Sequence, residues 1–255
     1  MNTSQITAVI LSFNEQDNIS RCLEALQPLQ RIVLVDSGSQ DRTVEIAKTF
    51  RNVEVFVRPF DNFENQWEFG RSKVQTEWTL DMDADYIVPA SFWDEVARID
   101  ENSKVRGYSA SFEYCIYGNA IPAAVYPERV VLYAKSEGAY KMHGHTQWLS
   151  IEGKLAPLTC KFLHDDRKDL NRWLLNQLKY ARDNVNDPLS RNSIRSLAKR
   201  LRPLGFVTPI LMLVYCLFGK GLIFAGRPGI YYSCQRMFAE LLSCIHVMDR
   251  KIARK

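Results

Sequence analysis

The sequence has 255 residues, 46% of them hydrophobic and 24% charged, as expected of a globular protein with a sizeable core. Its six cysteines are scattered, without a CxxC pair or zinc-ligand spacing, which argues against a zinc site and favours reduced thiols in a cytosolic protein. The net charge of +4 hides an asymmetry, because residues 1–160 carry 15 basic and 22 acidic side chains whereas residues 161–255 carry 18 and 7.

The N-terminal third alternates short apolar runs with segments of helical periodicity. Four runs are predicted to be strands: residues 6–13, 31–35, 53–57 and 78–80. Between them, apolar spacing predicts one helix around Ile19 to Leu26 and another that begins at Asp41 or Thr43. This alternation predicts an α/β fold with a doubly wound parallel sheet, in which ligands bind beyond the carboxyl ends of the strands.

The rest of the chain changes in character. Residues 108–117 and 130–133 are rich in aromatic and β-branched side chains and are predicted to be strands, with a turn at Gly118. Residues 166–190 are predicted to be a helix that ends near Pro188. We therefore expect one domain over residues 1–165 and a helical extension over residues 166–255.

The extension combines a basic segment with a short apolar run. Five basic side chains come first: Arg191, Arg195, Lys199, Arg200 and Arg202. The run over residues 206–218 is too short for a transmembrane helix, which needs about 20 apolar residues. This pattern favours an interfacial helix on an anionic bilayer, with a core helix as the alternative. Nucleic acid is not expected as a partner, because no recognised motif accompanies the charge.

The most informative motif is the acidic run that follows the fourth predicted strand. In an extended segment Asp81, Asp83 and Asp85 would share one face. Such closely spaced like charges favour a cation, and Mg²⁺ or Mn²⁺ prefers carboxylate oxygen and often brings a substrate phosphate. An EF-hand loop is excluded, because Tyr86 and Phe92 stand where it needs Gly and Glu. We predict a metal–diphosphate site, with a solvated acidic turn as the alternative.

Four segments complete the pattern: residues 11–15, 35–43, 80–85 and 164–168. Together they resemble the family 2 glycosyltransferases, which have a GT-A fold. The resemblance is closest to the subgroup that includes lipopolysaccharide-core β-glucosyltransferases. It covers about residues 5–90 through the N-E, D-S-G-S-x-D-x-T and D-A-D motifs, while the later segment and the tail look like those of membrane-associated members.

The resemblance implies an inverting transfer of a sugar from a nucleotide-diphosphate donor, usually a UDP-sugar, to a hydroxyl group. The implied acceptor is a bacterial lipopolysaccharide core, a surface polysaccharide or a lipid-linked glycan. The implied location is the cytoplasmic face of the inner membrane, and the polar N-terminus lacks the pattern of a signal peptide. Residues 1–165 would then be a catalytic domain, with a nucleotide-binding half to about residue 90 and an acceptor half over residues 91–165.

Two other functions stay open. A nucleotidyltransferase shares the α/β sheet and the metal-bound phosphate, but it usually carries a Gly-rich basic loop, which residues 12–17 do not provide. A catalytically degenerate, membrane-associated scaffold is the other alternative. The intact Asp36, Asp83 and Asp85 argue against it.

The resemblance also assigns roles to residues. Asp83 and Asp85 match its DxD positions and would hold Mg²⁺ or Mn²⁺, with His164 as a candidate third ligand. Asp36 matches the residue that contacts the uracil base. The predicted nucleotide-sugar-binding residues are Ser12, Asn14, Glu15, Asp36, Ser37, Arg71 and Asp83. For Glu15 the alternative is a helix-start residue, and for Arg71 a solvated surface position.

The general base is predicted in the later segments. An inverting displacement needs a carboxylate or an imidazole to take the proton of the acceptor hydroxyl. Many members of the family use an acid within an acidic pair, and Asp165-Asp166 is the pair available here. Related core-sugar transferases carry a Val-His-Glu segment, and in the corresponding place His145 stands where Glu is expected. We therefore expect Asp165 or Asp166 to be the base, and then His145.

Overall fold

The strand β1 (Ile6–Ser12) lies inside the main sheet, with six of its seven residues buried. The computed structural model describes residues 1–100, 103–122, 126–143, 146–186, 205 and 207–253. β1 pairs in parallel with β2 (Ile32–Asp36) and β4 (Trp78–Asp83), and β2 pairs in parallel with β3 (Val53–Val57). The four predicted strands are thus confirmed, since continuous apolar runs suit strands that are buried on both faces.

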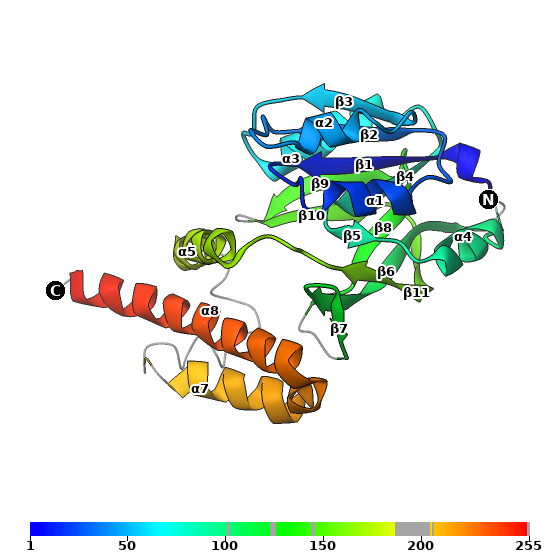
Figure 1. Cartoon of the computed structure of the whole chain (residues 1–255). Helices are drawn as coiled ribbons and strands as arrows, with labels where there is room; N and C mark the ends of the chain where they lie inside the picture. The colour runs from blue at the N-terminus through cyan, green and yellow to red at the C-terminus, as the bar shows by residue number, and fades with distance from the viewer. Residues whose placement is uncertain (101–102, 123–125, 144–145, 187–204, 206, 254–255) are drawn as a thin grey trace. The chain divides into compact units, whose positions relative to one another are not determined.

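The parallel arrangement predicted from the first four strands holds for β3, β2, β1 and β4, and beyond β4 the sheet is mixed. Its order is β3-β2-β1-β4-β8-β6-β11-β5 (Figure 1). β8 (Arg129–Ala134) runs antiparallel to β4 and to β6 (Val105–Ile116), and β11 (Lys154–His164) runs parallel to β6. The short β5 (Tyr86–Ile87) is antiparallel to β11. Parallel neighbours need long crossover connections, usually helices, whereas antiparallel neighbours do not.

Helices cover both faces of the N-terminal half of the sheet. The core on one face includes residues of α1 (Ile19–Ala25), α2 (Thr43–Ala47) and α4 (Ala90–Ala97). The other face carries α3 (Phe63–Lys73) and the two-stranded sheet of β9 (Gly138–His143) and β10 (Thr146–Ile151). Trp67 of α3 stacks on Tyr140 of β9, with ring centroids 5.5 Å apart.

The chain divides into two units. The first contains residues 1–118, 125–142 and 146–167, and the second contains residues 119–124, 143–145 and 168–255. His145 and the basic residues between 191 and 202 lie outside the described part of the chain. The division of residues 1–165 into nucleotide-binding and acceptor halves stays a prediction.

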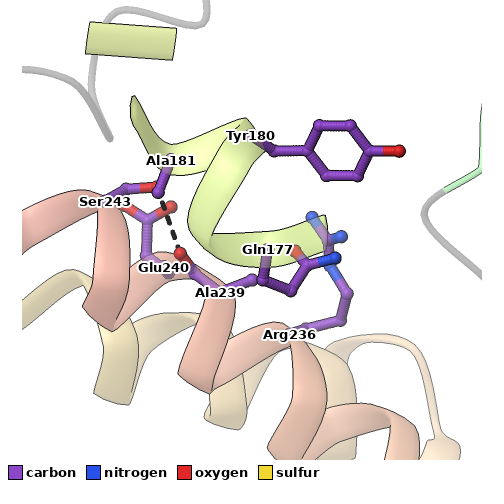
Figure 2. A pocket seen from close by; sticks show the side chains of 7 residues that line it. All are labelled: Gln177, Tyr180, Ala181, Arg236, Ala239, Glu240 and Ser243. Carbon is purple, nitrogen blue, oxygen red and sulfur yellow. Dashed lines mark hydrogen bonds between the residues drawn. The ribbon is translucent and has the colours of Figure 1, made fainter. Parts of the chain in front are cut away.

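The second unit is mainly helical. Its elements are β7 (Asn119–Ile121), α5 (Leu170–Asn186), α7 (Val207–Val214), a π-helical turn (Tyr215–Gly219), a 3₁₀ turn (Leu222–Ala225) and α8 (Gly226–Ala253). α8 packs against α5 and α7. Gln177 and Tyr180 of α5 line a pocket of about 220 Å³ together with Arg236 and Glu240 of α8 (Figure 2).

No single helix among the described residues is both long and apolar enough to cross a bilayer. The segments Val207–Gly219 and Leu222–Ala253, bent by 72° at the break between them, meet the length and composition criteria as a pair.

Gly70 of α3 provides a test of the packing between α3 and the sheet. A Cβ atom at this position would lie 2.4 Å from Cγ1 of Val9 and 3.2 Å from Cγ2 of Val35. Both valines are buried and stiff, so Gly70→Ala must displace the helix or the strands. Overpacking costs roughly 1–3 kcal/mol, and a contact of 2.4 Å belongs to the upper half of that range, against about 1 kcal/mol gained in helix propensity. We expect the free energy of unfolding in urea to fall by about 1–2 kcal/mol.

Ser72→Ala, at an exposed position of the same helix, is the matched control. It should unfold within about 0.5 kcal/mol of the wild type. A Gly70→Ala protein as stable as this control would contradict the close approach of α3 to β1.

Candidate active site

The strands β1, β2 and β4 end at one edge of the sheet. In the strand register Ser12 faces Asp36, and Leu11 faces Asp83. The predicted nucleotide residues and the acidic run are therefore neighbours in space, although Ser12 and Asp85 are 73 residues apart in sequence. Polar groups at the carboxyl ends of parallel strands are the usual ligand contacts of such a sheet.

Asp36 organises the loop that follows β2. Its buried carboxylate accepts hydrogen bonds from the hydroxyls of Ser12 (2.9 Å) and Ser39 (2.5 Å) and from the N–H groups of Gly38 (3.0 Å) and Ser39 (2.8 Å). Gly38 has a φ of 88°, which glycine adopts without strain. The contact between Asp36 and a base stays a prediction, while its structural role is visible in these four bonds.

The loops after β1 and β2 are joined by hydrogen bonds. The Asn14 N–H donates to the Ser39 hydroxyl (2.7 Å), and the Gln40 N–H donates to Asn14 Oδ1 (2.7 Å). The Glu15 N–H donates to the Thr43 hydroxyl (2.6 Å). Asn14 has a φ of 55°, a left-handed conformation that asparagine tolerates better than most residues. The two loops thus form one pre-shaped edge.

Hydrogen bonds hold the side chains of Ser37 and Arg71 in place. The Ser37 hydroxyl accepts a hydrogen bond from Gln66 Nε2 (2.9 Å). Arg71 Nε donates to the Glu68 carboxylate (3.0 Å), and its Nη1 donates to the Lys135 carbonyl (3.2 Å). These contacts fix both side chains, and the contact of either one with a nucleotide sugar stays a prediction.

The acidic run divides into a buried part and an accessible part, because β4 continues as far as Asp83. Asp81 lies within the strand, is only 7% exposed and accepts a hydrogen bond from the Tyr140 hydroxyl. Burial raises the pKa of Asp81 to about 7. Asp83 ends the strand with its side chain 39% exposed, and burial together with the charge of Asp85 raises its pKa. Asp85 follows in the turn before β5.

The end of β11 lies against this turn. The Asp165 N–H donates to the Asp85 carbonyl (3.0 Å), and His164 Nε2 lies 3.2 Å from Asp85 Oδ2. Although burial lowers the pKa of His164, the neighbouring Asp85 raises it above the ordinary value. Three tyrosine rings have centroids between 4.4 and 5.3 Å from the imidazole, namely Tyr86, Tyr114 and Tyr126. The buried Nδ1 has no hydrogen-bond partner among the described residues.

The two candidate bases have different environments. Asp165 is 3% exposed and accepts from Arg21 Nη1 (2.5 Å), Arg167 Nε (2.9 Å) and the Gly118 N–H (2.9 Å). Its oxygens are thus engaged in ion pairs and a backbone contact. Asp166 is half-buried and accepts from Asn18 Nδ2 (3.1 Å).

Asn18 joins this segment to the loop after β1. Its Nδ2 donates both to Asp166 Oδ1 (3.1 Å) and to Glu15 Oε2 (2.9 Å). Its Oδ1 accepts from the Arg167 N–H (3.0 Å) and from Arg21 Nη2 (2.8 Å). One amide therefore connects a predicted nucleotide residue with a predicted base.

The sequence analysis did not identify Asn18, Arg129 or Tyr126. Arg129 Nη1 lies 3.8 Å from Asp83 Oδ2, and its guanidinium lies 5.2 Å from the centre of the Tyr126 ring. The Tyr126 hydroxyl forms a hydrogen bond with that of Tyr86, next to the acidic turn. Single polar residues of this kind belong to no motif. Arg129 begins β8, which pairs with β4, whereas Asn18 lies at the start of α1.

The carboxylates of Asp83 and Asp85 suit a hard divalent cation. Each increases the cost of the other's negative charge, as the raised pKa of Asp83 shows, and a cation would relieve this repulsion. Within the described part of the chain, His, Cys, Asp and Glu side chains form no cluster of three or more that could hold a metal. Mg²⁺ commonly binds one or two carboxylates and takes its other ligands from water and substrate phosphates. The metal role of His164 stays a prediction.

Similar proteins are named as glycosyltransferases. An uncharacterized glycosyltransferase of Rickettsia typhi is 31% identical over 96 residues, which are 37% of this chain and 32% of that protein. The lipopolysaccharide core biosynthesis glycosyltransferase LpsC of Rhizobium meliloti is 27% identical over 84 residues, 31% of each chain. These matches span about a third of the length of the relatives. The crystal structure of S. aureus TarS 1-349 in complex with UDP has a TM-score of 0.48 and 13% identity, covering 97% of this chain and 92% of that one.

A family model matches a longer part of the chain. The model described as glycosyl transferase family 2 matches residues 7–144, which is more than half of the sequence. This range contains both polar loops and the acidic run, and it ends before His164. The mixed α/β sheet agrees with the GT-A fold that the motifs imply. The chain belongs to glycosyl transferase family 2.

Proposed function

We propose that this protein is an inverting glycosyltransferase that moves a sugar from a UDP-sugar to a hydroxyl group of a bacterial surface glycan or of its lipid-linked precursor. One observation carries the proposal. The end of β11 brings a histidine and two carboxylates against the acidic turn, and this turn shares a sheet edge with the two polar loops. If these groups are the donor site and the proton acceptor, the two are adjacent, which supports sugar transfer in a chain of family 2.

On the donor side, the joined loops would receive the nucleoside, and the acidic turn would receive the diphosphate. Asp83 and Asp85 would hold Mg²⁺ or Mn²⁺, which stabilises the negative charge of the departing diphosphate when it is bound. Arg129 adds a positive charge beside Asp83. His164 holds Asp85 from the opposite strand and so fixes the turn.

In the reaction, the acceptor oxygen forms a bond to the anomeric carbon of the sugar while the bond from that carbon to the phosphate oxygen breaks. The diphosphate leaves with the bonding electron pair, and the configuration inverts because the attack comes from the opposite face. Asp166 takes the proton of the acceptor hydroxyl as general base. Asp165 positions the segment through Arg21 and Arg167.

Two observations support the proposed acceptor and location. LpsC, which is similar over part of this chain, is named for lipopolysaccharide core biosynthesis. All six cysteines are free, and four of them are buried, as suits a protein of a reducing compartment. We therefore place the reaction at the cytoplasmic face of the inner membrane, on a core or lipid-linked acceptor.

The metal assignment is tested by Asp83→Asn and Asp85→Asn. Each change should lower the Mn²⁺-dependent release of UDP from a panel of UDP-sugars by about 100-fold or more, because metal stabilisation of the leaving group contributes several kcal/mol. Asp94→Asn, an exposed acid of α4, is the control and should keep wild-type activity. Wild-type activity in both site variants would show that neither carboxylate holds the metal.

The two candidate bases are separated by measuring activity and stability together. Asp166→Asn should lower kcat by roughly 10²–10⁴-fold, as expected for a lost general base, with little change in the urea midpoint. Asp165→Asn should lower the free energy of unfolding by about 1–3 kcal/mol, because the buried carboxylate loses its charge-assisted hydrogen bonds to the half-buried Arg21 and the exposed Arg167. An inactive Asp165→Asn protein of normal stability, next to an active Asp166→Asn protein, would assign the base to Asp165 instead.

A further inference from the structure

One face of the helical segment Val207–Gly219 is apolar and exposed. Its side chains are 48–65% exposed and recur at the spacing of a single helical stripe, and they are Ile210, Leu211, Val214, Tyr215 and Phe218. The opposite side of the segment packs on α8, where the Thr208 hydroxyl lies 3.0 Å from Cys244 Sγ. A helix between a protein core and water normally exposes polar residues, so this stripe calls for an apolar partner.

The turn after this helix extends the apolar surface. Phe224 is 92% exposed, whereas its neighbour Leu222 is fully buried and anchors the turn. Gly221 and Gly226 flank the turn with φ values of 67° and 64°, a conformation that glycine adopts at no steric cost. The turn therefore holds an aromatic ring away from the unit's own core. We call Phe224 and the five stripe residues the apolar hairpin face.

The charge around this face has a single sign. The described residues 207–239 contain three Lys or Arg and no Asp or Glu. Two of these cations, Lys220 and Arg227, lie on either side of the turn, and Lys220 Nζ lies 5.9 Å from the centre of the Tyr215 ring. Apolar side chains bordered by cations match a bilayer with anionic headgroups, since the acyl region takes the first and the headgroups attract the second.

We propose that the apolar hairpin face inserts into one leaflet of an anionic bilayer, with Lys220 and Arg227 at the level of the headgroups. The chain bends by 72° between Val207–Gly219 and Leu222–Ala253, and α7 packs against α8, so the turn between them is available to enter the leaflet. An acidic peptide or a nucleic acid would pair with Lys220 and Arg227 but would leave the exposed rings of Phe218 and Phe224 uncovered. This inference uses only residues of the second unit and does not depend on the proposed sugar transfer.

The experiment is flotation of the full-length protein with vesicles of phosphatidylglycerol and phosphatidylcholine, compared with vesicles of phosphatidylcholine alone. We expect binding to the anionic vesicles and about tenfold weaker partitioning of the double variant Phe218→Ser/Phe224→Ser. Leu175→Ser/Leu178→Ser is the control, because it removes two exposed apolar side chains of α5 that lie outside the apolar hairpin face. The control should float as the wild type does.

A second measurement reports which partner covers the face and does not depend on the serine variants. In Phe224→Trp, lipids brominated in the acyl chain should quench the added tryptophan fluorescence, in excess of any quenching of the wild type. Circular dichroism checks that every variant is folded. Absence of this quenching, equal flotation of wild type and Phe218→Ser/Phe224→Ser, or binding that ignores lipid charge would each overturn the proposal. Vesicle-independent self-association that the serine pair abolishes would assign the face to a second copy instead.

Discussion

The contact between the Asp85 turn and the end of β11 is the constraint on which the site depends. It joins two parts of the chain that are about 80 residues apart in sequence, through one backbone hydrogen bond and one side-chain pair. Without it, Asp83 and Asp85 would be an isolated acidic turn, and Asp166, the proposed base, would not lie near them. The strand pairing of β5 with β11 positions these groups before any substrate arrives.

The contact also explains how several charged side chains can lie close together. Four carboxylates gather at this edge, and three arginines and a histidine lie among them. Asp165 is paired with two guanidinium groups and Asp85 with the imidazole, so the fold itself neutralises these two acids. Asp83, the most exposed of the run, has only a distant cation at 3.8 Å. The uneven pairing marks the position where an external cation would contribute most.

Local sequence predicted the N-terminal half of the sheet well, because β1 and β2 are buried on both faces and are therefore almost wholly apolar. The start of β4 was predicted from Trp78 to Leu80, which lead directly into the acidic run. Local sequence did not predict α3. The buried residues of this helix are Gln66, Trp67 and Gly70, so the helix has no apolar stripe. It also missed the antiparallel position of β8 beside β4. That pairing is set by contacts between strands some 50 residues apart, which no local pattern encodes.

In the site, too, the motifs predicted individual residues but not the residues that contact them. The motifs indicated Asp36, Asp83, Asp85 and the Asp165-Asp166 pair, because these residue types recur at fixed places after strands. They did not indicate which acid of the pair is held by arginines, since Arg21 lies on α1, far from the pair in sequence. Arg129 was likewise not predicted. A single cation at the start of a strand belongs to no motif, and its role follows from Asp83, which lies beside it in the folded chain.

The amide of Asn18 has a consequence for the order of events. It bonds Glu15 of the nucleotide loop and Asp166 with the same nitrogen, so a shift of one carboxylate changes the position of the other. A donor that moved this loop would thereby also move Asp166, the proposed base. Such a linkage favours a compulsory sequence in which the donor binds first and the acceptor meets a base already in place, which protects the activated sugar from attack by water.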